Sequence, residues 1–457
     1  MIELALHEDL TTALVVDLFV LTGCSVLLIR YGRLAHSHPA VTYLFFHLVV
    51  ITSRLLAVMA GAETLFSKWG GIFEPVTEGE LVRAAFVADL VLVIMTIACI
   101  LASRSDQKRS ARLAENPAAN HSTLSLRNIW TVVGIAFPIG VLAVAVLGSV
   151  PGFEKPEIDF GEWQESSWLI VTTTWAGLSL LALIYWYGFR WWLVAPMGIY
   201  LFIMSVQGFH RFRAIIPLIL LLQIYLDRHQ KKWPPTYIMA VIIAAMLLFY
   251  PMKTIGRMAQ EGATVTEISE SSTEILREVA AGQNGDQTLL DQLASSLTLI
   301  DRADKFYYGT IYLALFSSPI PRQWWPEKPT LSEHNFAFST PSRPMAEMGM
   351  VMTFIGEAYI NFGYFGVVII SFLTAYWLAR LYFRAYRTSY HSVVRFGYLL
   401  IACNLIQIYR DGLMSLFIFT VINMMPLSAI VVLHWVRPLR PRRQAALVYG
   451  QTLPQKQ

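Results

Sequence analysis

The sequence has little charge for its length. Asp, Glu, Lys and Arg make up 14% of its 457 residues, against about a quarter in soluble domains. Hydrophobic residues make up 55%, and the mean hydropathy is +0.51. A soluble enzyme or a disordered chain of this length needs far more polar surface. The composition therefore excludes both classes and indicates an integral membrane protein.

Cysteine is scarce, and metal and nucleotide motifs are lacking. The three cysteines, Cys24, Cys99 and Cys403, each lie inside an apolar run, which excludes a disulfide-built secreted domain. There is no HExxH, no paired Cys motif and no His triad, the usual patterns of zinc sites. GxxxxGK[ST] and GxGxxG loops are lacking too. We therefore expect metal-independent chemistry with no cofactor and no nucleic-acid partner.

Long apolar runs are what the sequence has in abundance. A helix that crosses the hydrocarbon layer needs about 20 apolar residues. We expect an all-α polytopic membrane protein with about eleven transmembrane helices, in a range of roughly 10 to 13. They are placed at 11–29, 40–59, 82–102, 129–149, 167–187, 192–208, 212–226, 235–250, 362–382, 396–409 and 413–435. The first run follows acidic Glu8 and Asp9 and lacks a basic region before it, so it is expected to be a permanent span and not a signal peptide.

The distribution of basic residues predicts the orientation. If the N-terminus lies outside, the inner segments hold more than half of the 35 Lys and Arg residues. Only Asp106, Glu115 and Asp227 of the 31 acidic residues join them. Positive charge collects on the inner side of membrane proteins. The pattern therefore predicts an outer N-terminus and a cytoplasmic C-terminus.

One long segment interrupts the spans and falls on the outer side. The expected organisation is an N-terminal bundle of about eight spans (1–250), an outer loop (251–361), about three C-terminal spans (362–436) and a basic cytoplasmic tail (437–457). A loop of this length is usually functional. Helical spacing predicts amphipathic helices at 271–281 and 286–300, with a third, apolar candidate at 305–316. The outer loop is therefore expected to be partly helical.

Three charged residues of the first three spans match in depth. Arg54, Asp17 and Asp89 lie roughly 8–11 Å below the outer face at about 1.5 Å per residue. Such charges are expensive in a membrane and often functional. Arg54 either forms a buried ion pair with one or both aspartates or points into a polar cavity and binds an anion.

Basic and aromatic residues gather at the expected outer face. His210, Arg211 and Arg213 precede the seventh span, and Arg322, Lys328 and Arg343 lie in the outer loop beside Trp324 and Trp325. Guanidinium groups match phosphate oxygens in pairs, although arginines also anchor helices in lipid headgroups. The tryptophans are either an interfacial belt or stacking platforms for sugar rings.

Polar residues continue where the chain enters the ninth expected span. Glu357, Tyr359 and Asn361 alternate with apolar residues, and Arg410 and Asp411 form a charged tip between two short spans. A carboxylate at the depth of Glu357 is costly unless it is compensated. Glu357 therefore either pairs with an arginine or acts as a base. The tip is either a local ion pair or part of the same polar site.

The loop and the ninth span together resemble a known family. Its features are Pro321-Arg322-Gln-Trp-Trp-Pro326-Glu-Lys328-Pro329, then Pro341-Ser342, then Gly356-Glu357-Ala-Tyr359-Ile-Asn361-Phe-Gly363-Tyr-Phe-Gly366. These motifs, the multi-span layout and the long outer loop resemble the bacterial oligosaccharide repeat unit polymerases, the O-antigen polymerase or Wzy class. The likeness in layout covers most of the chain, and the distinctive motifs fall at about 320–370. The short loops of the first half depart from the class, which is often described with two sizeable outer loops.

The resemblance implies a metal-independent, inverting glycosyltransferase of GT-C-like type in the bacterial cytoplasmic (inner) membrane. Such an enzyme transfers a glycan from an undecaprenyl diphosphate carrier to a lipid-linked acceptor on the outer face, and so builds an O-antigen, capsule or exopolysaccharide. Membrane lipid, a chain-length regulator and a flippase are the partners to expect. Glu357 is the first candidate for the catalytic base and His210 the second. Diphosphate contacts are assigned to Arg211, Arg213, Arg322, Arg343 and Arg410, and sugar or lid contacts to Trp324, Trp325, Lys328, Tyr359 and Asn361.

Other functions remain open at this point. An O-antigen ligase uses the same donor but a different acceptor. A flippase or transporter of lipid-linked glycans should have duplicated halves and charges near the bilayer midplane, whereas here the charges crowd the outer third. A binding or assembly module would not depend on Glu357 or Arg211 for polymer formation.

Overall fold

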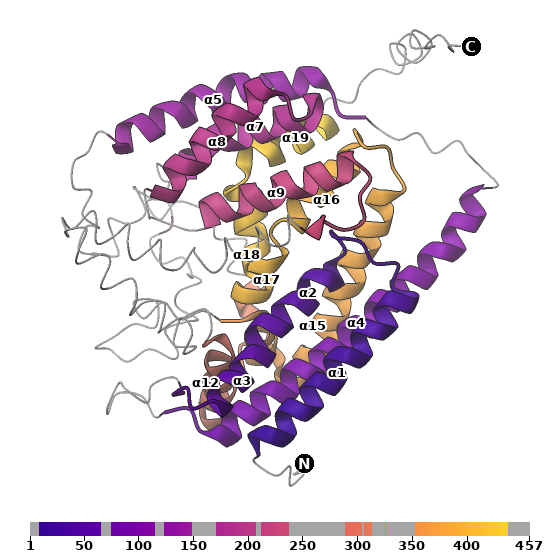
Figure 1. Ribbon diagram of the computed structural model, residues 1–457, viewed down its shortest axis with the longest axis vertical. Helices are drawn as coiled ribbons and strands as arrows, with labels where there is room; N and C mark the ends of the chain where they lie inside the picture. Colours follow the sequence, from indigo (N-terminus) through magenta and orange to yellow (C-terminus); the bar gives the residue numbers. More distant parts are fainter. Residues whose placement is uncertain are drawn as a thin grey trace.

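The expected all-α class is confirmed in the part of the chain that the structure describes. The structure is a computed structural model that describes residues 9–64, 75–114, 123–148, 171–206, 212–236, 288–303, 306–312, 325 and 352–436. Within these ranges every regular element is a helix (Figure 1), and β-pairing is limited to an isolated bridge between Thr123 and Ser392.

Five described helices are long and apolar enough to cross a membrane. They are α1 (Leu10–Tyr31), the run of α2 (Pro39–His47), η1 (Leu48–Thr52) and α3 (Ser53–Met59), then α4 (Glu78–Ala114), α5 (Leu126–Gly148) and α15 (Phe354–Tyr386). A sixth candidate is the bent pair formed by α18 (Leu413–Phe417) with η2 (Ile418–Ile422) and α19 (Met425–Val436). The chain is therefore built as a polytopic membrane protein.

The other expected spans appear as shorter helices where they are described. These are α7 (Thr174–Tyr187), α8 (Trp191–Val206), α9 (Phe212–Arg228), α16 (Val393–Ala402) and α17 (Leu405–Asp411). Most of the expected span at 235–250 lies outside the described residues. The structure thus places helices at most of the predicted apolar runs, while the count of eleven spans and the GT-C-like arrangement stay predictions.

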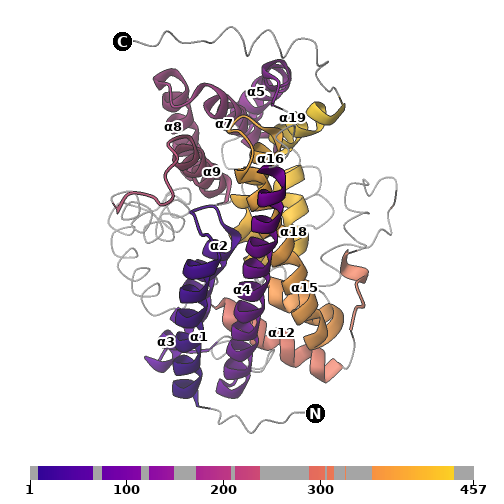
Figure 2. The same ribbon diagram turned by 90° about the vertical axis from the view of Figure 1, so that its right-hand side faces the viewer.

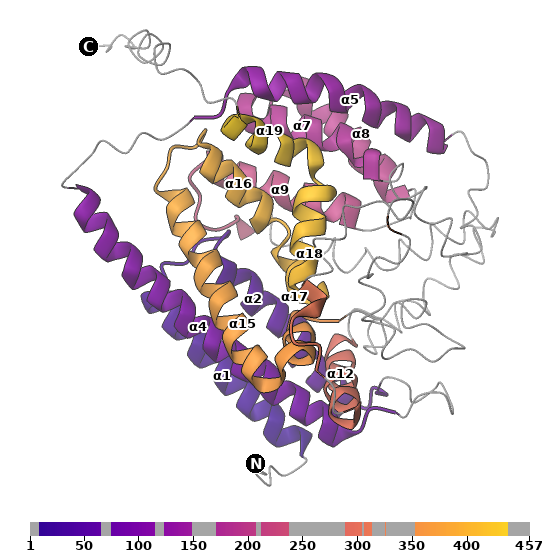
Figure 3. The same cartoon turned by 180° about the vertical axis from the view of Figure 1, so that it is seen from behind.

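The helices form two groups, each with its own buried core. Helices α1 to α4, α15 and α17 share the first core with α12 (Leu289–Ala303), and helices α5, α7, α8, α9, α16 and α19 share the second. Figures 1 and 2 show the first group below the second. Figure 3 shows α4 and α15 side by side along the first group. Alanines make this close packing possible: Ala88, Ala98, Ala375 and Ala379 are completely buried.

Helix α12 confirms the amphipathic helix expected at 286–300. It buries Leu289, Leu293, Leu297 and Ile300, the residues at helical spacing, against η1 and the starts of α4 and α15. This helix of the expected outer loop thus packs on one end of the first helix group. The opposite end of the group is fastened by Asp106, which pairs with Arg33 at 3.3 Å and Arg387 at 3.1 Å.

Candidate functional site

A break in α15 organises the polar residues at the end of the first group covered by α12. Phe362 and Gly363 leave the helical conformation, and Gly363 has a φ of +63°, which favours glycine. The amides of Tyr307 and Tyr308 donate to the carbonyls of Ile360 and Asn361 at 3.0 Å. The carbonyls that lose their helical partners at the break thus accept hydrogen bonds from the segment 306–312, and these bonds hold the segment against α15.

Asn361 ties this segment to the helix with its side chain. Its Oδ1 accepts from the amide of Gly309 at 3.0 Å, and its Nδ2 donates to the carbonyl of Glu357 at 2.8 Å. The side chain is completely buried. Asn361 therefore positions the turn of α15 that carries Glu357.

Glu357 is the buried carboxylate that lacks a basic partner among the described residues. It is 4% exposed, and its Oε2 accepts from the amide of Met414 at 3.4 Å, while Oε1 has no hydrogen-bond partner within the described ranges. The other described buried carboxylates lie beside basic or imidazole groups: Asp106 beside Arg33 and Arg387, Asp227 beside Arg395, Asp291 beside Arg54, and Asp17 and Asp89 beside His47. Its burial without a cation among the described residues makes Glu357 a candidate for proton transfer.

Tyr312 lies beside the Glu357 carboxylate. Burial, followed by the negative charge of Glu357, raises the pKa of its phenol well above the ordinary value. Tyr312 therefore keeps its proton at neutral pH. Because the Tyr312 phenol is neutral, the segment 306–312 places no charged group beside the carboxylate.

The structure brings Glu357 against the tip that joins α17 to α18. Arg410 donates to Asp411 at 2.8 Å, and Gly412 follows with a φ of +92°. A Cβ on Gly412 would overlap Oε2 of Glu357. The predicted residues Glu357 and Arg410 thus lie in one region, and glycine is required for the close approach.

We expect Gly412→Ala to impair both the fold and the activity. A non-glycine residue at this φ costs about 1–3 kcal/mol, and the added methyl group displaces Glu357. Thermal unfolding in detergent and activity in cells are the measurements. Gly397→Ala is the matched control, because its Cβ meets no atom within 4 Å and it lies in α16. Equal behaviour of the two variants would contradict the contact.

A second polar cluster reaches the surface of the same end, and we call it the outer patch: Arg83, Asp301 and Tyr364, which are partly exposed, and Tyr359, which is 3% exposed beneath them. Arg83 pairs with Asp301 at 2.6 Å and donates to the hydroxyls of Tyr359 and Tyr364 at 3.0 Å. Tyr359 in turn donates to Asp301 at 2.5 Å. The side chains of Arg83 and Asp301 are 34% and 39% exposed. The patch therefore offers donors, acceptors and aromatic rings to a hydroxyl-rich ligand.

Only Tyr359 of the outer patch was expected from the sequence. Arg83 begins the third predicted span, where an arginine at a helix end is ordinary, and Asp301 looks like a solvated end of the amphipathic helix. Their meeting depends on how α12 docks on α4, which spacing along the chain does not reveal.

The expected ion pair of Arg54 with Asp17 or Asp89 is wrong in its partners. Arg54 donates instead from Nε and Nη2 to both oxygens of Asp291 in α12, at 2.8 and 2.7 Å. Asp17 and Asp89 flank His47, with Oδ1 atoms 2.7 and 3.3 Å from its Nε2. Equal depth does not place side chains on facing sides of their helices, which explains the error.

Of the remaining predicted site residues, the structure describes Arg213 and Trp325. Arg213 lies near the start of α9 in the second helix group, and no described contact joins it to Glu357 or Arg410. Trp325 is 43% exposed. The predicted site residues outside the described ranges are His210, Arg211, Arg322, Arg343, Trp324 and Lys328.

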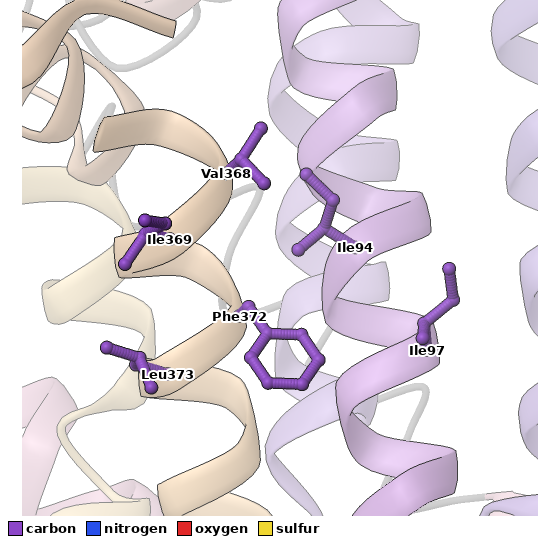
Figure 4. A pocket seen from close by; sticks show the side chains of 6 residues that line it. All are labelled: Ile94, Ile97, Val368, Ile369, Phe372 and Leu373. Atoms are coloured by element: carbon purple, nitrogen blue, oxygen red, sulfur yellow. The ribbon is translucent and has the colours of Figure 1, made fainter. Parts of the chain in front are cut away.

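An apolar groove of about 320 Å³ runs between α4 and α15. Figure 4 shows the side chains that line it: Ile94, Ile97, Val368, Ile369, Phe372 and Leu373. It begins one to two turns along α15 from the break at Gly363. The groove suits a hydrocarbon chain better than a polar ligand, because all six side chains are apolar.

Comparison with known proteins gives the family. The family model described as O-antigen polysaccharide polymerase Wzy matches residues 10–437, nearly the whole chain. No curated protein and no solved structure matches the chain. The match includes the segment 306–312, α15 with Glu357, and the Arg410–Gly412 tip. The chain belongs to the O-antigen polysaccharide polymerase (Wzy) family.

Proposed function

We propose that the protein polymerises lipid-linked oligosaccharide repeat units at the outer face of the bacterial cytoplasmic membrane. The carrier is undecaprenyl diphosphate, and the product is a surface polysaccharide such as an O-antigen, a capsule or an exopolysaccharide. The observation that carries this proposal is the environment of Glu357, a buried carboxylate without a basic partner in the described ranges, beside an arginine-bearing tip. A flippase and a chain-length regulator are the proposed partners.

The proposed reaction is a single displacement at the anomeric carbon of the donor. A hydroxyl oxygen of the acceptor forms the new glycosidic bond, the bond from sugar to diphosphate breaks, and the configuration inverts. Glu357 takes the hydroxyl proton as general base, with His210 as the second candidate. The electron pair of the broken bond leaves with the lipid diphosphate.

Positive charge stabilises the leaving diphosphate without a metal in this scheme. Preorganised cations lower the energy of the charge that develops as the bond breaks. Arg410 supplies one such cation from the tip beside Glu357. Arg211, Arg213, Arg322 and Arg343 are the further proposed contacts to the diphosphate.

The sugar units are proposed to lie over the outer patch. Arg83 and Tyr364 are partly exposed there, whereas Tyr359, expected as a sugar contact, is 3% exposed and holds Arg83 and Asp301 in place. Trp324, Trp325 and Lys328 are proposed to complete the sugar contacts. Asn361 was expected among the sugar contacts, but its side chain is fully buried and bonds to Gly309 and Glu357. We therefore propose it as a positioning residue instead.

We propose an outer N-terminus and a cytoplasmic C-terminus, an orientation in which the site faces outward. Support comes from the two ends of the first helix group. At the end with α12, Arg54 and Arg83 each have a carboxylate of their own, Asp291 and Asp301. At the opposite end Arg33 and Arg387 share Asp106, so these three side chains sum to one positive charge. Basic residues favour the cytoplasmic side.

The polyprenyl tail of the carrier is proposed to lie in the apolar groove between α4 and α15. Ile97→Trp should fill the groove and lower turnover of the long-chain substrate several-fold, while a short-chain analogue should react as with the wild type. Leu90→Trp is the control, since Leu90 is similarly exposed on α4 outside the groove. Equal loss on both substrates would contradict this placement.

A gene deletion tests the function in cells. Loss of the protein should leave single repeat units on the carrier and on the cell surface, and the wild-type gene should restore long chains. A ligase would instead leave long chains on the carrier lipid, and a flippase would leave single units on the inner face. Either pattern would overturn the proposal.

A further inference from the structure

Three ionisable side chains from three helices meet in the interior of the first helix group. They are Asp17 of α1, His47 at the end of α2, and Asp89 of α4. Nε2 of His47 lies 2.7 Å from Asp17 Oδ1 and 3.3 Å from Asp89 Oδ1. One potential ligand atom from each residue lies within 4.8 Å of the other two, and all three residues are buried.

The cluster is incomplete as a set of hydrogen bonds. The N–H at Nε2 of His47 donates to Asp17 Oδ1. Asp17 Oδ2 and both oxygens of Asp89 then have no donor among the described residues. Asp89 is 4% exposed and aims its carboxylate at the imidazole. Buried carboxylate oxygens without donors are costly.

The charges of the cluster also do not balance. With a neutral imidazole it carries two negative charges, and with an imidazolium it still carries one. Within the described ranges, no lysine or arginine forms an ion pair with Asp17 or Asp89, and Arg54 is engaged by Asp291 instead. An uncompensated charge in a helix bundle destabilises it strongly.

We propose that Asp17, His47 and Asp89 bind one divalent transition-metal ion, with Zn²⁺ as the first candidate. Two carboxylates, a neutral imidazole and a divalent cation sum to zero charge. Zn²⁺ takes imidazole nitrogen and carboxylate oxygen at about 2.0–2.2 Å, so ligand atoms in a tetrahedral site lie roughly 3.3–3.4 Å apart. The Asp89 distance already has this value, and Asp17 needs to withdraw by roughly 0.6 Å.

The backbone beside His47 supports a specialised site. The α-helical pattern of α2 ends at His47, and the next five residues, Leu48–Thr52, form a π-helical turn. Single π-turns are uncommon within helices and recur at functional sites. The π-helical turn follows His47 directly. It is a feature of the backbone, so it is an observation separate from the side-chain contacts.

The proposed ion is separate from the transfer reaction, and water or the second oxygen of Asp17 would fill the fourth position that three ligands leave open. It would tie α1, α2 and α4 together, and none of its three ligands contacts Glu357 or the outer patch among the described contacts. Its presence would correct the expectation, drawn from missing sequence motifs, that the chain holds no metal. The ligands come from positions 17, 47 and 89, which is too wide a spacing for a motif.

Metal content and heat stability of the purified full chain test the proposal. Protein in detergent is stripped with a chelator, reloaded with Zn²⁺ alone, washed and measured by mass spectrometry for bound zinc. We expect about one ion per chain and a higher unfolding temperature after reloading. Asp89→Asn and His47→Gln should weaken binding by more than about 100-fold and remove the thermal shift.

Matched variants separate metal binding from general damage. Asp227→Asn removes a buried carboxylate that pairs with Arg395, so it should lower stability yet keep the zinc-dependent shift. His47→Cys keeps a metal-binding side chain and should restore a shift with Cd²⁺, which prefers thiolate. Wild-type protein that binds no zinc, or zinc that remains at full stoichiometry in both Asp89→Asn and His47→Gln, would overturn the proposal. Stabilisation by low pH without metal would assign a proton to the cluster instead and would also overturn it.

Discussion

Glu357→Gln should abolish polymer formation while the protein remains folded. Glutamine keeps the shape of the side chain and a carbonyl oxygen for the amide of Met414, but it cannot take a proton from the acceptor. Loss of a general base costs about 10²–10⁴-fold in rate. Cells that carry this variant should show single repeat units and no ladder of longer chains at normal protein abundance.

A control variant separates this effect from damage to the bundle. Asp106→Asn removes a buried carboxylate at the opposite end of the first helix group, where it binds Arg33 and Arg387. It should lower heat stability but retain polymerisation per folded molecule. Full-length polymer from Glu357→Gln would show that Glu357 is a structural acceptor for the tip and not the base.

Arg54→Met should release α12 from the membrane helices. The guanidinium contacts both oxygens of Asp291 and the carbonyl of Glu63 in a site where both side chains are fully buried. Removal of one partner leaves a buried charge, at a cost of about 3–5 kcal/mol. The measurements are the thermal unfolding temperature and the rate of proteolysis within 288–303, and polymerisation should fall with them.

Two further variants define the cause of this loss. Arg54→Met combined with Asp291→Leu removes both charges and should recover most of the stability, because apolar pairs often replace buried ion pairs well. Arg33→Met is the exposed control. Its side chain is 53% exposed and its partner Asp106 keeps Arg387, so the cost should stay below about 1 kcal/mol. A double variant as unstable as Arg54→Met alone would contradict the buried-charge explanation.

The sequence predicts well those features that depend on local patterns. The apolar face of α12 follows from the helical spacing of Leu289, Leu293, Leu297 and Ile300. Such an apolar face depends only on residues three or four positions apart along the chain.

Pairings between distant segments could not be predicted in the same way. Arg54 and Asp291 are 237 residues apart, and the depth of Arg54 in its helix gives no information on the direction of its side chain. The break at Gly363 was missed because the apolar run at 362–382 begins there, whereas α15 starts at Phe354. His47 was missed because a single histidine in an apolar run has no pattern that links it to Asp17 and Asp89.

Reconstitution of the purified protein with a defined undecaprenyl-diphosphate-linked repeat unit tests the central claim most directly. The account predicts that the wild type converts this single substrate into lipid-linked chains of increasing length and releases undecaprenyl diphosphate, and that Glu357→Gln does neither. Transfer of the glycan only to a different acceptor lipid, or chain growth that persists in the Glu357→Gln protein, would contradict the account.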